Sequence, residues 1–209
     1  MHLTLRHHAY KKEQPSGHFH NDVGSITLAV AGIPVFVDPG SYVYTPSAVW
    51  RNQFRSVAAH NTFFIQDVEP VVFNERSLFN LDLPEHTVGS SPWQVKHDLY
   101  SIPAARTLMF KDEVTIILQD RWEEVEGHTF ISAWNFTLGP SIIPVQKGSS
   151  WHLQHEGKTL VIVTCQDLNF TVSDSWYAPQ YGTKVACKKL IARCDLSAQP
   201  VTITMQVQR

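Results

Sequence analysis

The chain has 209 residues, of which 43% are hydrophobic and 17% are charged, a balance that is typical of a globular domain and excludes a disordered chain. A formal net charge of -2 gives no overall basic field, so the composition does not indicate nucleic acid or an anionic membrane surface as a partner. No apolar run is long enough to span a bilayer, and the first residues lack the apolar segment of a signal peptide. We therefore expect one sizeable domain that covers residues 1–209.

The first third of the chain predicts strands and one short helix. Residues 3–8 and 25–30 alternate polar and apolar side chains, and a turn leads from the second of these strands into a third at 35–37. The stretch from Pro46 to Ala59 has the spacing of a short helix, with Val49, Phe54 and Val57 on one side. It is the one helix that we expect.

Beyond Asn61 the pattern consists of short strands separated by turn residues such as Glu126-Gly127 and Gly139-Pro140. The expected strands lie near residues 62–66, 71–74, 93–100, 104–111, 113–120, 128–138, 141–146, 150–155, 158–164, 168–173, 184–193 and 200–208. Many short strands with at most one or two short helices predict an all-β fold, a large antiparallel sandwich or a barrel. The three cysteines do not form a disulfide framework, and we expect free thiols.

Polar residues with metal-binding chemistry gather between Gly17 and Asn61. In an extended strand His18 and His20 point to one face, with Phe19 on the other. Asp38 ends one apolar run, and His60 precedes another. Imidazole and carboxylate groups that meet from three segments suit a borderline cation such as zinc.

Three motifs in this stretch resemble the heparinase II/III-like polysaccharide lyases. They are Gly17 to Asp22 (GHFHND), Val37 to Tyr44 (VDPGSYVY) and Trp50 to Thr62 (WRNQFRSVAAHNT). The resemblance implies a supersandwich-like β domain that follows an α/α toroid, and this chain is similar to the β domain alone. We therefore expect the toroid to be the missing partner domain.

The resemblance also implies roles for individual residues. The second His of the H-x-H pair, the Asp of V-D-P-G and the His of A-A-H-N hold a structural metal, often zinc, and they match His20, Asp38 and His60. The first His of the pair faces the cleft and matches His18, the catalytic candidate. The other catalytic groups of the family belong to the toroid, so the isolated chain is expected to be inactive.

The implied reaction is β-elimination from a uronic-acid polysaccharide, such as heparin, heparan sulfate or an alginate-like polymer. A base removes the C5 proton, an acid protonates the departing O4, and a cation neutralises the uronate carboxylate. Arg51 and Arg55, one helical turn apart, are candidates to bind that anionic sugar, although a structural ion pair explains them equally well. Tyr44 either lines the cleft or packs. By resemblance, the expected location is periplasmic or secreted in a bacterium.

Two other functions fit parts of the pattern. A cupin-like metal-dependent enzyme also uses H-x-H, a carboxylate and a later His, inside a barrel. A non-catalytic carbohydrate-binding module would need no metal. We expect Asp22 and Asn61 to form turn and loop hydrogen bonds.

Overall fold

A computed structural model describes residues 1–7, 19–73, 88–91, 93–100, 102–123, 125–195 and 199–208. Antiparallel strands dominate this part of the chain, and the prediction of an all-β fold is confirmed. The elements are β1 (His2–Leu5), β2 (Ile26–Val30), β3 (Ile33–Phe36), α1 (Ala48–Arg55), a 3-10 turn η1 (Val57–Ala59), β4 (Phe63–Ile65), β5 (Val88–Ser91), β6 (Gln94–His97), β7 (Ala104–Phe110), β8 (Thr115–Trp122), β9 (Ile131–Thr137), β10 (Ile143–Lys147), β11 (Ser150–His155), β12 (Lys158–Cys165), β13 (Thr171–Gln180), β14 (Thr183–Asp195) and β15 (Val201–Val207).

The largest sheet has eight strands in the order β10-β11-β12-β15-β8-β7-β6-β5. Tight turns join neighbouring strands such as β11 and β12, where Glu156 and Gly157 adopt positive φ angles. Strand β15 lies in the middle of the sheet, although it is the last described strand of the chain. Among the described strands the sheet keeps two open edges, at β10 and β5, so it is not a closed barrel.

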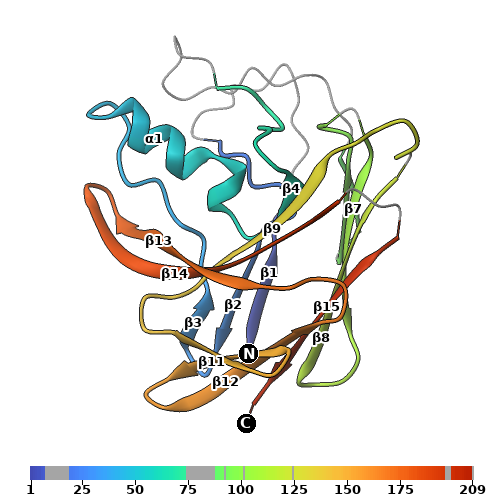
Figure 1. Cartoon of the computed structure of the whole chain (residues 1–209). Helices are drawn as coiled ribbons and strands as arrows, with labels where there is room; N and C mark the ends of the chain where they lie inside the picture. Colours follow the sequence, from blue (N-terminus) through green and yellow to red (C-terminus); the bar gives the residue numbers. More distant parts are fainter. Residues whose placement is uncertain are drawn as a thin grey trace.

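Two smaller sheets form the opposite layer of a sandwich (Figure 1). One has the order β1-β2-β3 and the other the order β13-β14-β9-β4. The two are joined where β3 runs out, because Phe36 bridges to Leu138 and the amide of Val37 donates to the carbonyl of Thr137 at 3.0 Å. Asp38 comes directly after Val37, so this junction fixes where the carboxylate leaves the sheet.

Side chains from both layers fill one hydrophobic core. Alternating residues of the strands point inward, as the period of two requires, and the pattern is clearest in β2 and β15. Ile26, Trp134 and Phe136 on one layer meet Leu118 and Ile203 on the other, all of them at most 2% exposed. Packing of this core holds the two layers in one register.

A helix forms within the predicted stretch from Pro46 to Ala59, but it is shorter than predicted and spans Ala48–Arg55. Helix α1 is capped by Ser47, whose hydroxyl accepts from the amide of Trp50, and it ends before Ser56, which is extended at ψ 142°. The buried face of α1 consists of Arg51, Phe54 and Arg55, and Val57 is buried outside the helix, in η1. Val49, which was expected on the buried side, is 76% exposed.

Three further expectations have clear outcomes. The predicted strand 168–173 starts later and runs further, as β13, because it pairs with β14 in a long hairpin. Strand β5 was not predicted, and the strand predicted at 71–74 is absent from the described residues 71–73. The cysteines Cys165, Cys187 and Cys194 are free, as expected. In the part of the chain that the structure describes, no helix combines the length and apolar character needed to cross a membrane.

Candidate metal centre

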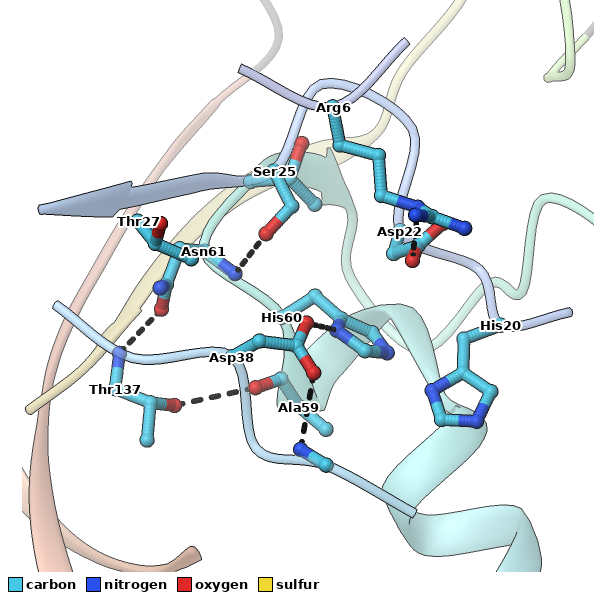
Figure 2. Close-up of polar contacts among 12 residues, drawn as sticks. Arg6, His20, Asp22, Ser25, Thr27, Asp38, Ala59, His60, Asn61 and Thr137 are labelled. Atoms are coloured by element: carbon cyan, nitrogen blue, oxygen red, sulfur yellow. Dashed lines mark hydrogen bonds and ion pairs between the residues drawn. The ribbon is translucent and has the colours of Figure 1, made fainter. Parts of the chain in front are cut away.

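Polar side chains from three segments meet at one point of the smaller sheets (Figure 2). His20 and Asp22 lie in the segment that leads into β2, Asp38 follows β3, and His60 follows η1. Each segment leaves or enters a buried strand, so the position of these side chains is set by the sheet rather than by local flexibility.

His60 and Asp38 form the centre of the cluster. Nδ1 of His60 lies 2.9 Å from Oδ2 of Asp38, and His60 is fully buried. Burial alone would lower the pKa of His60, but the charge of Asp38 and the hydrogen bond to it outweigh burial and raise the pKa. Burial would likewise raise the pKa of Asp38, and His60 together with the amide of Gly40 lowers that pKa to about 2. Asp38 is therefore an ionised carboxylate at neutral pH.

Asp22 is the member of the cluster that sequence reasoning missed. One ligand atom from each of Asp22, Asp38 and His60 lies within 4.8 Å of the others. Oδ2 of Asp22 pairs with Nε of Arg6 at 2.5 Å, while Oδ1 is buried and has no hydrogen-bond partner within the described residues. Burial raises the pKa of Asp22, against the charges of His60 and Arg6. The sequence H-x-H-x-D contains this residue, but a neighbouring Asn had suggested a turn.

His20 lies beside this cluster. Its ring centroid is 5.2 Å from that of His60, and its Nε2 is 3.4 Å from the hydroxyl of Ser41. Burial, followed by repulsion from His60, lowers the pKa of His20 to about 3. The imidazole is therefore neutral at physiological pH, which is the form that binds a metal.

These residues fit a divalent cation. Nε2 of His60 is buried and has no hydrogen-bond partner among the described residues, as is true of Oδ1 of Asp22. Buried polar atoms are normally satisfied, and an ion that accepts their lone pairs would satisfy both. Neutral imidazole and ionised carboxylate are the ligands that zinc takes.

A pocket of about 470 Å³ opens next to the cluster. Its polar lining includes Arg6, His20, Asp22, Asp38 and Ser41. The side chain of Asp38 is 41% exposed, whereas that of His60 is not exposed at all. The cluster therefore has one face in the protein interior and one face toward this pocket.

Asn61 and Arg106 hold the backbone around His60. The side-chain Nδ2 of Asn61 donates to the carbonyls of Ile26 and Val37, at 2.8 and 2.9 Å. Its Oδ1 accepts from the backbone amide of Thr137 at 2.6 Å. The expected loop hydrogen bonding of Asn61 is confirmed, and it joins three elements. Figure 2 shows the bond from Thr137. Arg106 donates to the carbonyl of Asn61 at 2.7 Å from the opposite layer.

The loop that carries Asp38 is fixed to the β13–β14 hairpin. The amide of Ala178 donates to the carbonyl of Pro39 at 2.8 Å, and the amide of Gly182 donates to the carbonyl of Tyr42 at 2.7 Å. A Cβ added at Gly40 would lie 2.4 Å from the carbonyl oxygen of Ala178, so only glycine fits. Tyr42 itself has a positive φ of 56°, a strained value for an aromatic residue.

Two other predicted site residues, Arg51 and Tyr44, contact each other at the end of this loop. Arg51 and Arg55 are buried, at 5% and 4% exposed, and Arg51 donates to the carbonyl of Tyr44 at 3.1 Å. Burial, with the charge of Arg51, lowers the pKa of Arg55. Tyr44 is half-buried and its ring lies 5.4 Å from that of Tyr181. His18, the catalytic candidate, lies outside the described residues.

The chain is similar to one protein family and to several solved structures. The family model described as "Heparinase II/III-like, C-terminal" matches residues 1–206. The crystal structure of heparan sulfate lyase HepC from Pedobacter heparinus superposes with a TM-score of 0.72 at 12% identity, over 90% of this chain and 30% of that one. A structure described as a heparinase III gene product has a TM-score of 0.74 at 15% identity, over 98% of this chain and 32% of its own.

These solved structures share the fold, and the chain spans about a third of their length. No curated protein matches the sequence. The similarity thus covers nearly the whole of this chain and a minor part of each larger protein.

Proposed function

Because the chain belongs to the heparinase II/III-like family, we propose that it acts as the β-sandwich domain of a polysaccharide lyase that cleaves a uronic-acid polysaccharide by β-elimination. The observation that carries the proposal is the pair of buried His60 and part-exposed Asp38. Nε2 of His60 has no hydrogen-bond partner among the described residues, and the ring lies beside His20 and Asp22. The neighbours named as heparan sulfate lyase and heparinase III make a glycosaminoglycan the first substrate class to test.

In this proposal His20, Asp38 and His60 hold a structural zinc ion, with Asp22 next to it. When bound, the ion would supply a fixed positive charge that ties three segments together. Asp38 keeps its carboxylate ionised for that purpose, and His20 stays neutral. The H-x-H segment is thereby held in place, and with it the direction of His18.

The reaction itself breaks the C5–H and C4–O4 bonds and forms a C4–C5 double bond. A base accepts the C5 proton and an acid donates a proton to the departing O4, so charge is conserved. We propose that His18 takes one of these roles, together with groups of an α/α toroid in the parent protein. Positive charge from the buried Arg51 and Arg55 would stabilise the uronate carboxylate.

The test uses a parent protein that contains both the toroid and this domain. Unsaturated uronate absorbs ultraviolet light, so heparan sulfate, heparin and alginate are assayed directly. We expect turnover of one of them, a loss of about 10²–10⁴-fold in His18→Ala, and no activity from the 209 residues alone. His152→Ala, a half-buried residue of β11 in the other layer, is the control and should retain activity.

Two results would contradict the proposal. Robust turnover by the 209-residue chain would show that half of the cleft suffices, and an unaffected His18→Ala parent would remove His18 from the mechanism. A parent that binds acidic polysaccharide without forming any unsaturated product would favour a non-catalytic binding module instead.

A further inference from the structure

The ammonium group of Lys184 lies between two indole rings next to the Asp38 loop. Its Nζ atom is 3.4 Å from the ring centroid of Trp50 and 3.6 Å from that of Trp176, and the ring of Tyr42 is 5.6 Å away. The two indoles are perpendicular, with centroids 6.1 Å apart. Helix α1, strand β13 and the 38–44 loop each contribute one ring, so three segments build this aromatic cage.

No acidic side chain of the described residues forms an ion pair with Lys184. Within the described residues it contacts aromatic faces, and no carboxylate or carbonyl oxygen forms an ion pair or hydrogen bond with it. An ammonium group carries three N–H donors, and two ring faces occupy two directions. One donor direction is left for an anion. Lys188, four residues along the same strand, differs because it pairs with Asp174 at 2.6 Å.

Aromatic surface extends from the cage toward solvent. Tyr181, at the tip of the β13–β14 hairpin, is 58% exposed, and its ring lies 5.4 Å from that of Tyr44. Exposed tyrosines offer an apolar face with a polar end, which suits the mixed surface of a pyranose ring. A fixed cation beside such faces selects a sugar that carries negative charge.

The cage is continuous with the candidate metal centre. Tyr42 accepts a hydrogen bond from the amide of Gly182 at 2.7 Å, and the preceding residue, Ser41, reaches His20 at 3.4 Å. A saccharide that lies along the loop from Ser41 to Tyr44 would thus reach both the pocket beside His20 and the hairpin tip. Only the short loop from Ser41 to Tyr44 separates the pocket beside His20 from the hairpin tip.

We propose that Lys184, with Tyr44 and Tyr181, forms a subsite for an acidic sugar of the substrate, in which the caged ammonium binds a carboxylate or sulfate oxygen. This proposal rests on the proposed function, because it places the bound acidic sugar next to the sugar that reacts. The aromatic cage fixes the ammonium before the ligand arrives, so little side-chain entropy is lost on binding.

Binding is measured on the 209-residue chain, where no turnover is needed. Calorimetry and tryptophan fluorescence follow titration with a heparan sulfate oligosaccharide, an alginate oligosaccharide and a neutral cello-oligosaccharide. For the acidic ligand that binds, we expect Lys184→Gln to weaken affinity by about 10-fold or more, because a charge-assisted hydrogen bond is lost. Lys184→Arg should retain most of the affinity, since guanidinium also stacks on aromatic rings.

Lys188→Gln is the matched control, because it removes the same charge from the same strand, and its affinity should stay within about 2-fold of the parent chain. The alginate oligosaccharide carries carboxylates and no sulfate, so tight binding of alginate would show that a carboxylate suffices as the bound group. Tyr181→Ala removes an exposed ring, which should leave the fold intact, and it should weaken acidic binding even if Lys184→Gln does not fold.

The proposal is overturned if no acidic oligosaccharide binds, if Lys184→Gln binds as tightly as the parent chain, or if Lys188→Gln loses as much affinity as Lys184→Gln. These outcomes are independent of the lyase assay. Binding through Lys184 in a parent protein without lyase activity would refute the proposed reaction and leave the acidic-sugar subsite standing.

Discussion

Nη1 of Arg106 lies 2.7 Å from the carbonyl oxygen of Asn61, the residue that follows His60. Arg106 is 1% exposed, and its Nε and Nη2 donate to the two carboxylate oxygens of Asp120, each at 2.7 Å. The indole of Trp134 adds a hydrogen bond to Asp120 at 2.9 Å from the opposite layer. This buried network spans the core and connects the eight-stranded sheet to the backbone of the candidate metal centre.

The carboxylate of Asp120 is expected to contribute strongly to the stability of the fold. Asp120→Asn leaves the Arg106 charge buried without its partner, so we expect the free energy of unfolding to fall by about 3–5 kcal/mol. Urea denaturation of the variant and the unmutated chain measures this change in the free energy of unfolding. Glu123→Gln is the matched control, since Glu123 forms ion pairs at the surface with Arg121 and Lys96, and it should change stability by less than about 1 kcal/mol. Equal losses in the two variants would show that the Arg106 network is not a core interaction.

The second prediction concerns the metal ligands. Elemental analysis of protein purified without chelator should find stoichiometric zinc, and His60→Ala should remove it because an imidazole ligand is lost. Asp22→Asn should weaken binding by about 10- to 100-fold, as expected for a neighbour of the ligands. His152→Ala should bind as the parent chain does. Absence of metal from the unmutated 209-residue chain would refute the metal site. Unchanged metal binding in Asp22→Asn would exclude Asp22 from it.

Removal of the metal should lower thermal stability. An ion that binds only the folded chain at about 100 times its Kd contributes about 2.7 kcal/mol by mass action. For a domain of this size the loss corresponds to a fall in Tm of about 5–10 °C. Calorimetry with and without chelator measures the shift. His60→Ala should show no response to chelator, and a response as large as that of the parent chain would place the ion elsewhere.

A glycine pair separates backbone strain from steric overlap. Gly32 and Gly40 have similar positive φ angles of 81° and 77°, but a Cβ at Gly32 would meet no atom within 4 Å, whereas one at Gly40 would meet the carbonyl of Ala178. We expect Gly32→Ala to cost about 1–2 kcal/mol of unfolding free energy from strain alone. Gly40→Ala should cost more, and it should also reduce metal content, since the amide of Gly40 donates to Asp38 at 2.9 Å. Equal losses of stability would argue against the contact with Ala178.

The thiol of Cys187 predicts a pH dependence. Burial raises the pKa of Cys187 to about 11, so at pH 8 only about 0.1% of this group is thiolate, the reactive form. Alkylation of the folded protein at Cys187 should therefore be slow and rise about tenfold per pH unit up to about 11. The folded state favours the protonated thiol, so this contribution to stability is present below the unfolded pKa of 9.0 and is lost as the pH rises toward 11. Mass spectrometry of alkylated peptides measures the rate.

The control for this experiment is the unfolded chain. In denaturant without reductant, all three cysteines should react at once, because none is in a disulfide. Fast alkylation of folded Cys187 at pH 8 would contradict its burial.

Strands were predictable where side chains alternate and turn residues bound them, as in β12 and β15. His20, Asp38 and His60 were selected by their match to the family motifs; the structure brings them close together, and their role as metal ligands stays a prediction. Asp22 was assigned to a turn, since nothing in its neighbours indicates that one of its oxygens is buried beside His60.

Long-range contacts had no local signal. The cage around Lys184 joins residues from position 42 to position 184, and single-sequence periodicity does not report such a contact. Val49 was misplaced for a different, local reason: it lies five residues before Phe54, about 140° away around the helix, so the two side chains do not share a face. Position along the chain was thus easier to predict than the face that a side chain presents.

The central place of β15 has a consequence for synthesis and folding. This strand separates β12 from β8 in the eight-stranded sheet, so each of these strands lacks one neighbour until residues 201–207 have left the ribosome. Pairing over such sequence separations is slow, and the exposed edges are open to association with other chains in the meantime. A nascent chain that stops before Val201 should be a target for chaperones and proteases, whereas a few further residues allow the two halves of the sheet to join.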